Sequence, residues 1–525
     1  MNSLMMLRFF CYGYFVIITF NENNSANRER SKKHKYYFSV NGDDQNDGSQ
    51  NRPFKTIDLF NSLKLYPGDS IFFKAGEIFM GNVILDSGKS GINGKAVVVT
   101  SYGHGNAIID AKNETAIALY HSSHVSINYL TLKGAGRKSG NTKAGLSIAD
   151  CHNISIDNID ISGFQKSGLQ IYSCKTVTLN KVYAHNNGAA GISVEGNYDN
   201  KLTSKDIRIT YCEADNNPGD PTNLTNHSGN GIVVGHCTNV VIDHCSATNN
   251  GWDMPRIGNG PVGIWCYEAD SVIIQHCLSY RNKTSAGGAD GGGFDLDGGV
   301  TNSVIQYCLS YENQGSGYCM FQYDGASPWY NNVIRFNISE NDGLVSDSRA
   351  GVYVWNSSKD EKHFYGCDFY NNTIYNSKQA AINFSETSQR ESFRFFNNIF
   401  IGRDSLVRGE EGDDIFLAND WYSIEKKFDA NGINSFEKWA VEQNKEQLNG
   451  KIVGLNLMPF FENAGNTRIT EANHLAAFDN YKIKRGSSLM TAGIDLKSLF
   501  GINIGSKDFN GEPVNIKCLG ACTHQ

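Results

Sequence analysis

The chain has 525 residues, of which 40% are hydrophobic and 19% are charged, and it contains 54 glycines but only 9 prolines. This composition favours short strands joined by tight turns and argues against a protein of long helices. The net charge of −7 and the isoelectric point near 6.0 leave no broad basic surface, which excludes nucleic acid as the expected partner.

The first residues of the chain predict export. Arg8 precedes an apolar run of 12 residues, Phe9–Phe20, which is too short to span a bilayer. We therefore expect residues 1–25 to be a signal peptide and expect no transmembrane segment. The protein is then secreted, periplasmic or held on the outer cell surface. The alternative is a cytoplasmic protein with an unusual N-terminus, because no clear small-residue cleavage site follows the apolar run.

Three short segments, Tyr36–Ser49, Pro53–Ile57 and Pro67–Gly76, precede the repeated part of the chain. With this opening the chain resembles the pectate-lyase-like right-handed parallel β-helix superfamily. The resemblance spans about residues 36–402, and residues 36–110 are expected to form an N-terminal cap and the first coils. The superfamily includes polysaccharide lyases, glycoside hydrolases, epimerases and phage adhesins, so the resemblance does not select a reaction.

Eight segments between residues 144 and 354 share one formula: a glycine, an apolar-x-apolar strand, a polar step, a second strand, and a cysteine or asparagine. Gly145, Gly168 and Gly191 stand 23 residues apart, which fits a β-helix coil and is too short for a propeller blade. Alternating apolar residues indicate strands with one buried face. The repeats therefore predict an all-β solenoid, a right-handed parallel β-helix of about ten coils over residues 36–402.

The sequence has 13 cysteines, and four of them occupy one position of the repeat. The next two coils carry asparagine at this position, so the series is Cys212, Cys245, Cys277, Cys308, Asn337 and Asn372. Such a series predicts an inward stack of small buried thiols. Disulfide bonds and metal ligation remain as alternatives in an exported protein.

The spacing of the repeat glycines grows after Gly191 to 40, 32, 30, 24 and 34 residues. Three successive insertions fall at the same turn, just before the glycine: residues 217–230, 251–261 and 283–291. Insertions from adjacent coils would project side by side and form a wall along one edge of the sheet. Long loops in a compact repeat are usually functional or disordered, and their stacking favours a binding groove.

Strand alternation predicts which side chains of the central coils point inward and which point outward. The inward columns are Ile232, Ile264, Phe294, Tyr318 and Val352, and then Val234, Cys266, Leu296, Met320 and Val354. The outward positions place Asp295 and Asp297 together on an exposed sheet face. Aromatic residues on the adjacent coils flank them: Trp265, Tyr267, Phe321, Tyr353 and Trp355. Exposed aromatic residues beside carboxylates indicate a polysaccharide or oligosaccharide as partner.

Paired carboxylates suggest glycoside hydrolysis. Asp290 ends the third insertion and is expected to lean over Asp295 and Asp297. Carboxylates this close repel each other and raise at least one pKa, as a general acid requires. We therefore expect Asp295 and Asp297, assisted by Asp290, to act as the acid and the base or nucleophile of a glycoside hydrolase that needs no cofactor. The spacing of about 6.6 Å between i and i+2 does not decide between retention and inversion.

The same three aspartates are also candidate calcium ligands, as in calcium-assisted polysaccharide lyases of this fold. A lyase needs a basic residue, and the cations near the wall are Arg256, Arg281, Lys283 and Arg335. None of the four occupies an outward strand position, which favours the hydrolase. Arg256, Lys283 and His227 are further candidates for substrate binding, although His227 in an asparagine-rich turn also fits a structural role.

A third class of function is a non-catalytic carbohydrate-binding or adhesive β-helix. Crowded carboxylates that must be desolvated are of little use to such a protein. The absence of coiled-coil heptads argues against a trimeric adhesin, and we expect a monomer.

Beyond residue 402 the repeat fades, and residues 403–525 are expected to form a mixed cap with one short helix over Ser435–Gln447.

Overall fold

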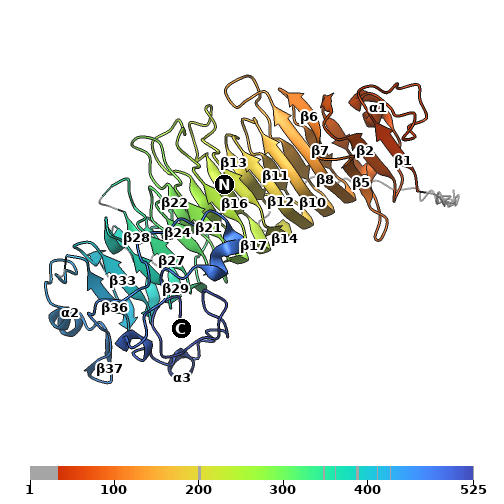
Figure 1. Ribbon diagram of the computed structural model, residues 1–525. Coiled ribbons are helices and arrows are strands. Elements are labelled where there is room, and N and C mark those ends of the chain that lie inside the picture. The colour runs from red at the N-terminus through yellow and green to blue at the C-terminus, as the bar shows by residue number, and fades with distance from the viewer. Residues whose placement is uncertain are drawn as a thin grey trace, which may run out of the picture.

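The computed structural model shows one elongated solenoid of parallel strands, capped at its C-terminal end (Figure 1). It describes residues 33–523 except 199–202, 347–348, 361, 386–388, 411 and 426. The predicted signal peptide lies outside the described residues. At the N-terminal end, the helix α1 (Ile57–Ser62) packs Ile57 and Phe60 into the core and is capped by the Thr56 side chain.

One face of the solenoid is a twelve-stranded parallel sheet with one strand per coil. The prediction was about ten coils. The strands of this sheet are β4 (Val83–Leu85), β7 (Ile117–Tyr120), β9 (Leu146–Ala149), β11 (Leu169–Tyr172), β13 (Ala190–Glu195), β16 (Asn230–Gly235), β19 (Val262–Tyr267), β22 (Gly292–Leu296), β25 (Tyr318–Gln322), β28 (Ala350–Asn356), β31 (Ala380–Ser385) and β34 (Val407–Gly409).

The remaining faces form one bent sheet with two rows of strands. The long strands β8 (Ser123–Gly134), β10 (His152–Ser162) and β12 (Lys175–His185) run through the bend and belong to both rows. The first row also contains β1 (Lys35–Phe38), β2 (Ser70–Lys74), β5 (Val97–Tyr102), β14 (Ser204–Thr210), β17 (Cys237–Asp243), β20 (Asp270–Gln275), β23 (Val304–Gln306), β26 (Asn332–Arg335), β29 (Tyr365–Tyr370), β32 (Glu391–Phe396) and β35 (Ile415–Leu417). The second row contains β3 (Ile78–Met80), β6 (Ala107–Lys112), β15 (Glu213–Asp215), β18 (Ser246–Thr248), β21 (Leu278–Tyr280), β24 (Leu309–Tyr311), β27 (Ile338–Glu340), β30 (Thr373–Tyr375), β33 (Ile399–Gly402) and β36 (Asp420–Ser423).

The predicted strand register is confirmed. Ile232 pairs with Ile264, and the column continues through Phe294 and Tyr318 to Val352, all fully buried. Apolar side chains stacked at every coil remove a continuous core from water, which is how a solenoid of short repeats becomes stable.

The cysteine series is also confirmed as an inward ladder. The backbone N–H of Cys212 donates to Cys245 Sγ at 3.4 Å, and the same contact is repeated between Cys245 and Cys277 and between Cys277 and Cys308. Cys308 then donates to the side chain of Asn337 at 2.9 Å. The twelve cysteines of the described residues are buried and free, which agrees with structural thiols and gives no disulfide.

A second buried ladder consists of asparagine side chains at the end of each repeat. Asn217 donates to Asn250, and the series continues through Asn282 and Asn313, with Nδ2 to Oδ1 distances of 2.9 to 3.0 Å. It ends at Asp342, whose carboxylate accepts from Asn313 at 2.8 Å. Each amide therefore satisfies buried backbone groups of the neighbouring coil.

Replacing Asp342 with asparagine is expected to flatten the pH dependence of stability. Burial raises the pKa of Asp342 to about 7, although Ser339 and Asn313 donate hydrogen bonds to it. Between about pH 4 and pH 7 the native carboxyl keeps its proton while the unfolded one has lost it, so stability falls as pH rises. An uncharged asparagine removes this loss and continues the ladder. Urea denaturation at several pH values measures the slope. The exposed Asp479→Asn is the control, and an unchanged slope in Asp342→Asn would contradict the prediction.

Stacked pairing continues past residue 402 through β35 and β36 as far as Ser423. The predicted helix is present as α2 (Phe436–Glu442), with the Ser435 hydroxyl accepting from the Lys438 backbone N–H. The other short elements of the C-terminal cap are β37 (Gln447–Leu448), β38 (Lys451–Ile452), η2 (Ala472–Ala477), η3 (Ser488–Met490) and α3 (Leu496–Phe500). One more short helix, η1 (Ser87–Lys89), lies near the N-terminal end of the solenoid.

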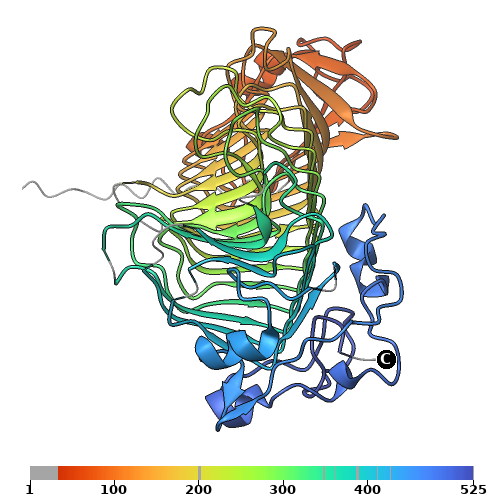
Figure 2. The same ribbon diagram turned by 90° about the vertical axis from the view of Figure 1, so that its left-hand side faces the viewer.

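The last segment of the chain turns back and lies against the bent sheet (Figure 2). The buried carboxylate of Glu340 holds it there by accepting hydrogen bonds from the backbone N–H and hydroxyl of Thr467 and from the Tyr481 hydroxyl, at 2.6 to 3.0 Å. The C-terminal cap therefore covers the flank of the solenoid and leaves the twelve-stranded sheet free for a binding site.

Candidate functional site

A cavity of about 690 Å³ lies over the outer face of the twelve-stranded sheet, at the coils of β16 to β28. Its lining contains two of the predicted aspartates, Asp290 and Asp297, and His227. It also contains all five predicted aromatic residues: Trp265, Tyr267, Phe321, Tyr353 and Trp355. The sequence therefore located eight of the side chains that gather at this cavity.

The three insertions form the predicted wall along one edge of the cavity. Asn259 Nδ2 of the second loop donates to Asn226 Oδ1 of the first loop at 3.2 Å. Gly260 of the second loop donates its backbone N–H to Asp290 of the third loop at 2.7 Å. Ala289 donates its N–H back to the Gly258 carbonyl at 2.9 Å. Each loop is thus braced by the next one, and the wall is continuous.

The expectation of an exposed sheet face was wrong. Trp265, Phe321 and Tyr353 point outward from their strands, yet they are only 3%, 7% and 6% exposed. The insertions cover them from one edge, and residues that follow the strands, such as Tyr198 and Tyr323, line the cavity as well. The site is therefore a partly open cleft and not a flat exposed face.

The three aspartates take two different positions. Asp290 and Asp297 are half-buried and line the cavity. Asp295 pairs in register with Trp265 and Cys319, is 2% exposed and does not line the cavity. Its Oδ1 atom is buried with no hydrogen-bond partner among the described residues. Of the three predicted aspartates the cavity therefore presents two, and Glu268 is a further carboxyl group of the lining.

The pKa values of all three carboxyl groups are raised. Burial raises the pKa of Asp297 to about 7, and the charges of Asp290 and Glu268 add to this, while the Gly298 backbone N–H lowers it. Burial also raises the pKa of Asp290, against the opposing effects of the Gly260 N–H and the charge of Arg349. At neutral pH the pair of Asp290 and Asp297 is therefore able to hold one proton and one negative charge.

Aromatic side chains stand on both sides of the aspartate strand. Trp265 stacks on Tyr267 at 5.4 Å and donates Nε1–H to Asn230 at 3.0 Å. On the other side, the Phe321 ring lies 5.4 Å from Tyr353 and 5.9 Å from Trp355. The rings are fixed by these contacts before any ligand binds, which lowers the entropy cost of binding.

His227 lies at the wall and contacts the edge of the Trp265 ring at 4.8 Å. Burial, with the neighbouring charge of Arg256, lowers its pKa to about 4, so its imidazole is neutral. Its Nδ1 lies 2.9 Å from Asn230 Nδ2. His227 therefore both braces the turn and faces the cavity.

Arg349 is a cavity residue that the sequence reasoning missed. Its guanidinium lies 4.8 Å from the Tyr353 ring, and its buried Nε has no hydrogen-bond partner in the part of the chain that the structure describes. It ends the loop before β28, and the 34-residue spacing between Gly317 and Gly351 was the available signal for this fourth insertion. Glu268 and His236 also line the cavity. Each directly follows a strand, and no change in the spacing of the glycines marks them.

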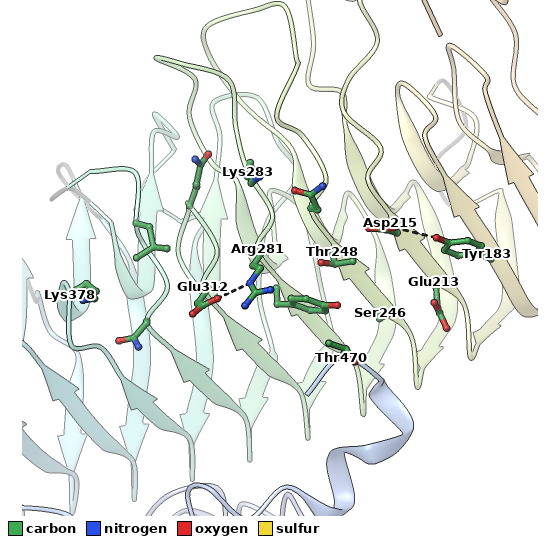
Figure 3. A pocket seen from close by; sticks show the side chains of 15 residues that line it. Tyr183, Glu213, Asp215, Ser246, Thr248, Arg281, Lys283, Glu312, Lys378 and Thr470 are labelled. Carbon is green, nitrogen blue, oxygen red and sulfur yellow. Dashed lines mark hydrogen bonds and ion pairs between the residues drawn. The ribbon is translucent and has the colours of Figure 1, made fainter. Parts of the chain in front are cut away.

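The predicted cations do not join the aspartates. Lys283 lines a separate hollow of about 770 Å³ on the second row of the bent sheet (Figure 3). Arg281 lines the same hollow and pairs with Glu312 at 2.8 Å. Lys283 was assigned to the substrate site because it begins the third insertion, but the start of a loop does not fix the face to which a side chain turns.

The two remaining arginines are engaged elsewhere. Arg256 donates to the Thr225 carbonyl at 2.9 Å within the wall and does not line the cavity. Arg335 donates to Gln306 and to the Asn503 carbonyl of the C-terminal segment. Neither is placed to abstract a proton from a ligand beside Asp297.

The three aspartates do not form a gathered donor set for calcium. Among the described residues, one group of three ligands has all its ligand atoms within 4.8 Å of one another, and it is Asp243, His244 and His276 on the bent sheet. Binding of Ca²⁺ by Asp290, Asp295 and Asp297 would need their side chains to rearrange.

Within the described residues, no helix has both the length and the apolar character needed to cross a membrane.

The fold and the site can be compared with known proteins. The structure of the GH136 lacto-N-biosidase from Eubacterium ramulus is similar with a TM-score of 0.50 and 15% identity, over 76% of this chain and 68% of that chain. The structure of pectate lyase Pel9A has a TM-score of 0.42 and 14% identity, over 94% of this chain and 97% of that chain. The uncharacterized protein YwoF of Bacillus subtilis (strain 168) is 29% identical over 125 residues, which are 22% of this chain and only 26% of YwoF.

The family model described as "Pel9A-like, right handed beta helix region" matches residues 36–351. The match begins at the opening segment Tyr36–Ser49 and contains the aspartates and the three insertions, whereas the cavity residues Tyr353 and Trp355 lie just beyond its end. Because it covers more than half of the chain, the protein belongs to the Pel9A-like right-handed β-helix family.

Proposed function

We propose that the protein is an exported polysaccharide-active enzyme, a glycoside hydrolase that uses Asp290 and Asp297 as its catalytic pair. One observation carries the proposal: two carboxyl groups with raised pKa line a cavity that also contains several aromatic rings. The same fold occurs in a lacto-N-biosidase, so the scaffold is compatible with such a site. The hydrolase needs no cofactor, and we expect the protein to act as a monomer on a polysaccharide or oligosaccharide.

The chemistry requires one proton and one negative charge at the scissile bond. The protonated carboxyl of the pair gives its proton to the leaving glycosidic oxygen, and the ionised one either attacks the anomeric carbon or activates a water. If the ionised carboxyl attacks, the other carboxyl, which has given up its proton, then activates a water that releases the sugar from the enzyme; if it activates a water, that water displaces the leaving group in a single step. Asp295, which lies on β22 and does not line the cavity, is not in contact with the sugar.

The aromatic walls suit the apolar C–H faces of a pyranose ring, whereas the carboxyl groups and Tyr323 supply hydrogen bonds to its hydroxyls. Asp290, Asp297, Glu268 and His227 contribute to this lining, and Arg349 is the one cation among its residues in the described chain. This balance favours uncharged sugars at the catalytic pair.

The test is incubation of the purified protein with a panel of plant, algal and animal polysaccharides and oligosaccharides, with and without a chelator. New reducing ends without ultraviolet absorbance are expected for hydrolysis. Absorbance from unsaturated uronates would overturn the hydrolase assignment, and saturable binding without product would place the protein among non-catalytic carbohydrate-binding β-helices.

A second candidate function is a polysaccharide lyase, and Arg349 is the observation that favours it. The guanidinium is inside the cavity, on the same side as Tyr353, where a uronate carboxylate would be neutralised. In this alternative Asp290, Asp295 and Asp297 would serve a calcium ion. Loss of ultraviolet-absorbing product on chelation, and in Arg349→Ala, is the result that would support it.

Replacing Trp355 with alanine is expected to raise KM about tenfold and to change kcat less, because the ring contacts the sugar and takes no part in bond cleavage. Trp355 is half-buried, lines the cavity and contacts Phe321. Steady-state kinetics on the substrate found in the panel measure both constants. Trp252→Ala is the matched control, since Trp252 is exposed and lies outside the cavity lining. Equal KM values in Trp355→Ala and wild type would remove Trp355 from the binding site.

A further inference from the structure

Asp243, His244 and His276 form a cluster on the bent sheet, away from the catalytic cavity. Asp243 ends β17, His244 follows it, and His276 follows β20 on the next coil. Asp243 Oδ1 lies 2.8 Å from His244 Nδ1 and 2.8 Å from His276 Nδ1. The three ligand atoms lie within 4.8 Å of one another. Two imidazoles from successive coils therefore converge on one carboxylate oxygen.

The two imidazoles are held in place by a stack of rings along the solenoid. Tyr211 stacks on His244 at 5.0 Å, His244 lies 4.8 Å from His276, and His276 stacks on Tyr307 at 5.2 Å. Tyr307 in turn donates its hydroxyl hydrogen to the Lys507 carbonyl of the C-terminal segment. The ring orientation is thus set by neighbours that do not belong to the cluster, as in metal sites whose ligands are fixed by outer contacts.

The cluster is open to ions from solvent. The side chains of Asp243, His244 and His276 are 24%, 28% and 36% exposed. A neutral imidazole carries one proton, and with that proton on Nε2 the Nδ1 lone pair is available to an ion. An ion beside the three atoms would replace two hydrogen bonds by three metal–ligand bonds.

We propose that Asp243, His244 and His276 bind a divalent transition-metal ion of the zinc class, with water completing the coordination. Two imidazole nitrogens and one carboxylate oxygen suit Zn²⁺, Ni²⁺ or Cu²⁺. Calcium prefers six to eight oxygen ligands, and this cluster offers it too few. The site links the coils of β17 and β20, so a bound ion would stabilise the middle of the solenoid without touching the catalytic pair.

The experiment is titration of the full chain with ZnCl₂ by isothermal calorimetry, with a thermal unfolding scan at each concentration. Wild type is expected to bind one ion with saturation and to unfold at a higher temperature when the ion is present. His276→Gln and Asp243→Asn are each expected to weaken binding at least about tenfold. CaCl₂ is expected to give neither binding heat nor a shift.

His185→Gln is the matched control. His185 also lies beside an aspartate, Asp160 at 3.3 Å, and also stacks on a tyrosine, Tyr183 at 4.4 Å, but it has no second imidazole. Its replacement is expected to leave zinc binding unchanged. Absence of saturable zinc binding to wild type, or equal affinity in His276→Gln, would overturn the proposal and leave the cluster as a pair of hydrogen bonds to Asp243.

Discussion

Asp297→Asn and Asp290→Asn are each expected to lower kcat/KM on the substrate of the enzyme on the order of 10³-fold, because each removes one partner of the acid–base pair. Asparagine has nearly the shape of aspartate, so the cavity keeps its form and substrate binding persists. The measurement is initial-rate kinetics, with circular dichroism to confirm folding. Asp160→Asn, on the bent sheet and far from the cavity lining, is the control and is expected to keep full activity.

Asp290→Asn and Asp297→Asn also show which of the two aspartates is the proton donor and which is the base or nucleophile. The variant that lacks the proton donor is expected to recover activity on an aryl glycoside with a good leaving group, since that substrate needs no protonation. The other variant is not expected to recover. Asp295→Asn is expected to lose much less activity than either, because its side chain does not line the cavity. Full activity in both Asp290→Asn and Asp297→Asn would refute the proposed function.

The pH profile follows from the raised pKa of Asp297. The pKa of about 7 means that Asp297 keeps its proton below about pH 7 and loses it as pH rises above that value. The value of kcat/KM is therefore expected to fall on the alkaline side through about pH 7. A profile that stays flat from about pH 5 to pH 9 would be inconsistent with a carboxylic acid as proton donor.

Asn250→Ala is expected to destabilise the protein by about 4 kcal/mol, because it leaves several buried polar groups unpaired at once. The Asn250 side chain accepts from the backbone N–H and the amide of Asn217, and it donates to the Ala214 carbonyl and to Asn282. Alanine can replace none of these bonds. Chemical denaturation of the full chain measures the difference in the free energy of unfolding.

The control for this variant is Asn466→Ala in the C-terminal segment. Asn466 is exposed and its amide donates to Asn463 and Ala464 nearby in the chain, so its loss is expected to cost less than about 0.5 kcal/mol. If Asn250→Ala were as mild as this control, the asparagine ladder would contribute little to stability, and the apolar columns would carry the fold alone.

Much of the fold could be predicted because every coil of a β-helix must bury side chains at the same positions against its neighbours, so the sequence pattern repeats. The period-2 pattern located the inward columns from Ile232 to Val352, and the Cys212 series located the thiol ladder. The end of the stacking was harder to predict, since in the twelve-stranded sheet β31 has Ala381 where the preceding coil has the glycine of the formula, Gly351. The ladder that begins with the cysteines nevertheless continues there, from Asn372 through Asn398 to Asn419.

Many of the residues of the candidate site were predicted from the sequence, but the burial of their side chains by the insertions was not. Strand alternation placed Asp297, Trp265 and Phe321 on one face, because a side chain in a strand has only two directions. The side chain of a residue in a turn has no such constraint. The spacing of the repeats therefore could not predict that Arg349 and Tyr323 line the cavity or that Lys283 does not. The difference between Asp295 and Asp297 arises because the strand β22 ends at Leu296 and frees the following residue to face the cavity.

The ladder of thiols has a consequence for refolding. Twelve cysteines are reduced and shielded while the chain is folded, and each becomes reactive when the coils separate. In an oxidising medium any mismatched disulfide that forms in the opened chain would prevent the parallel sheets from pairing again. Loss of the native state would then be irreversible, and the lifetime of the protein outside a reducing compartment would depend on its unfolding rate and not on its equilibrium stability.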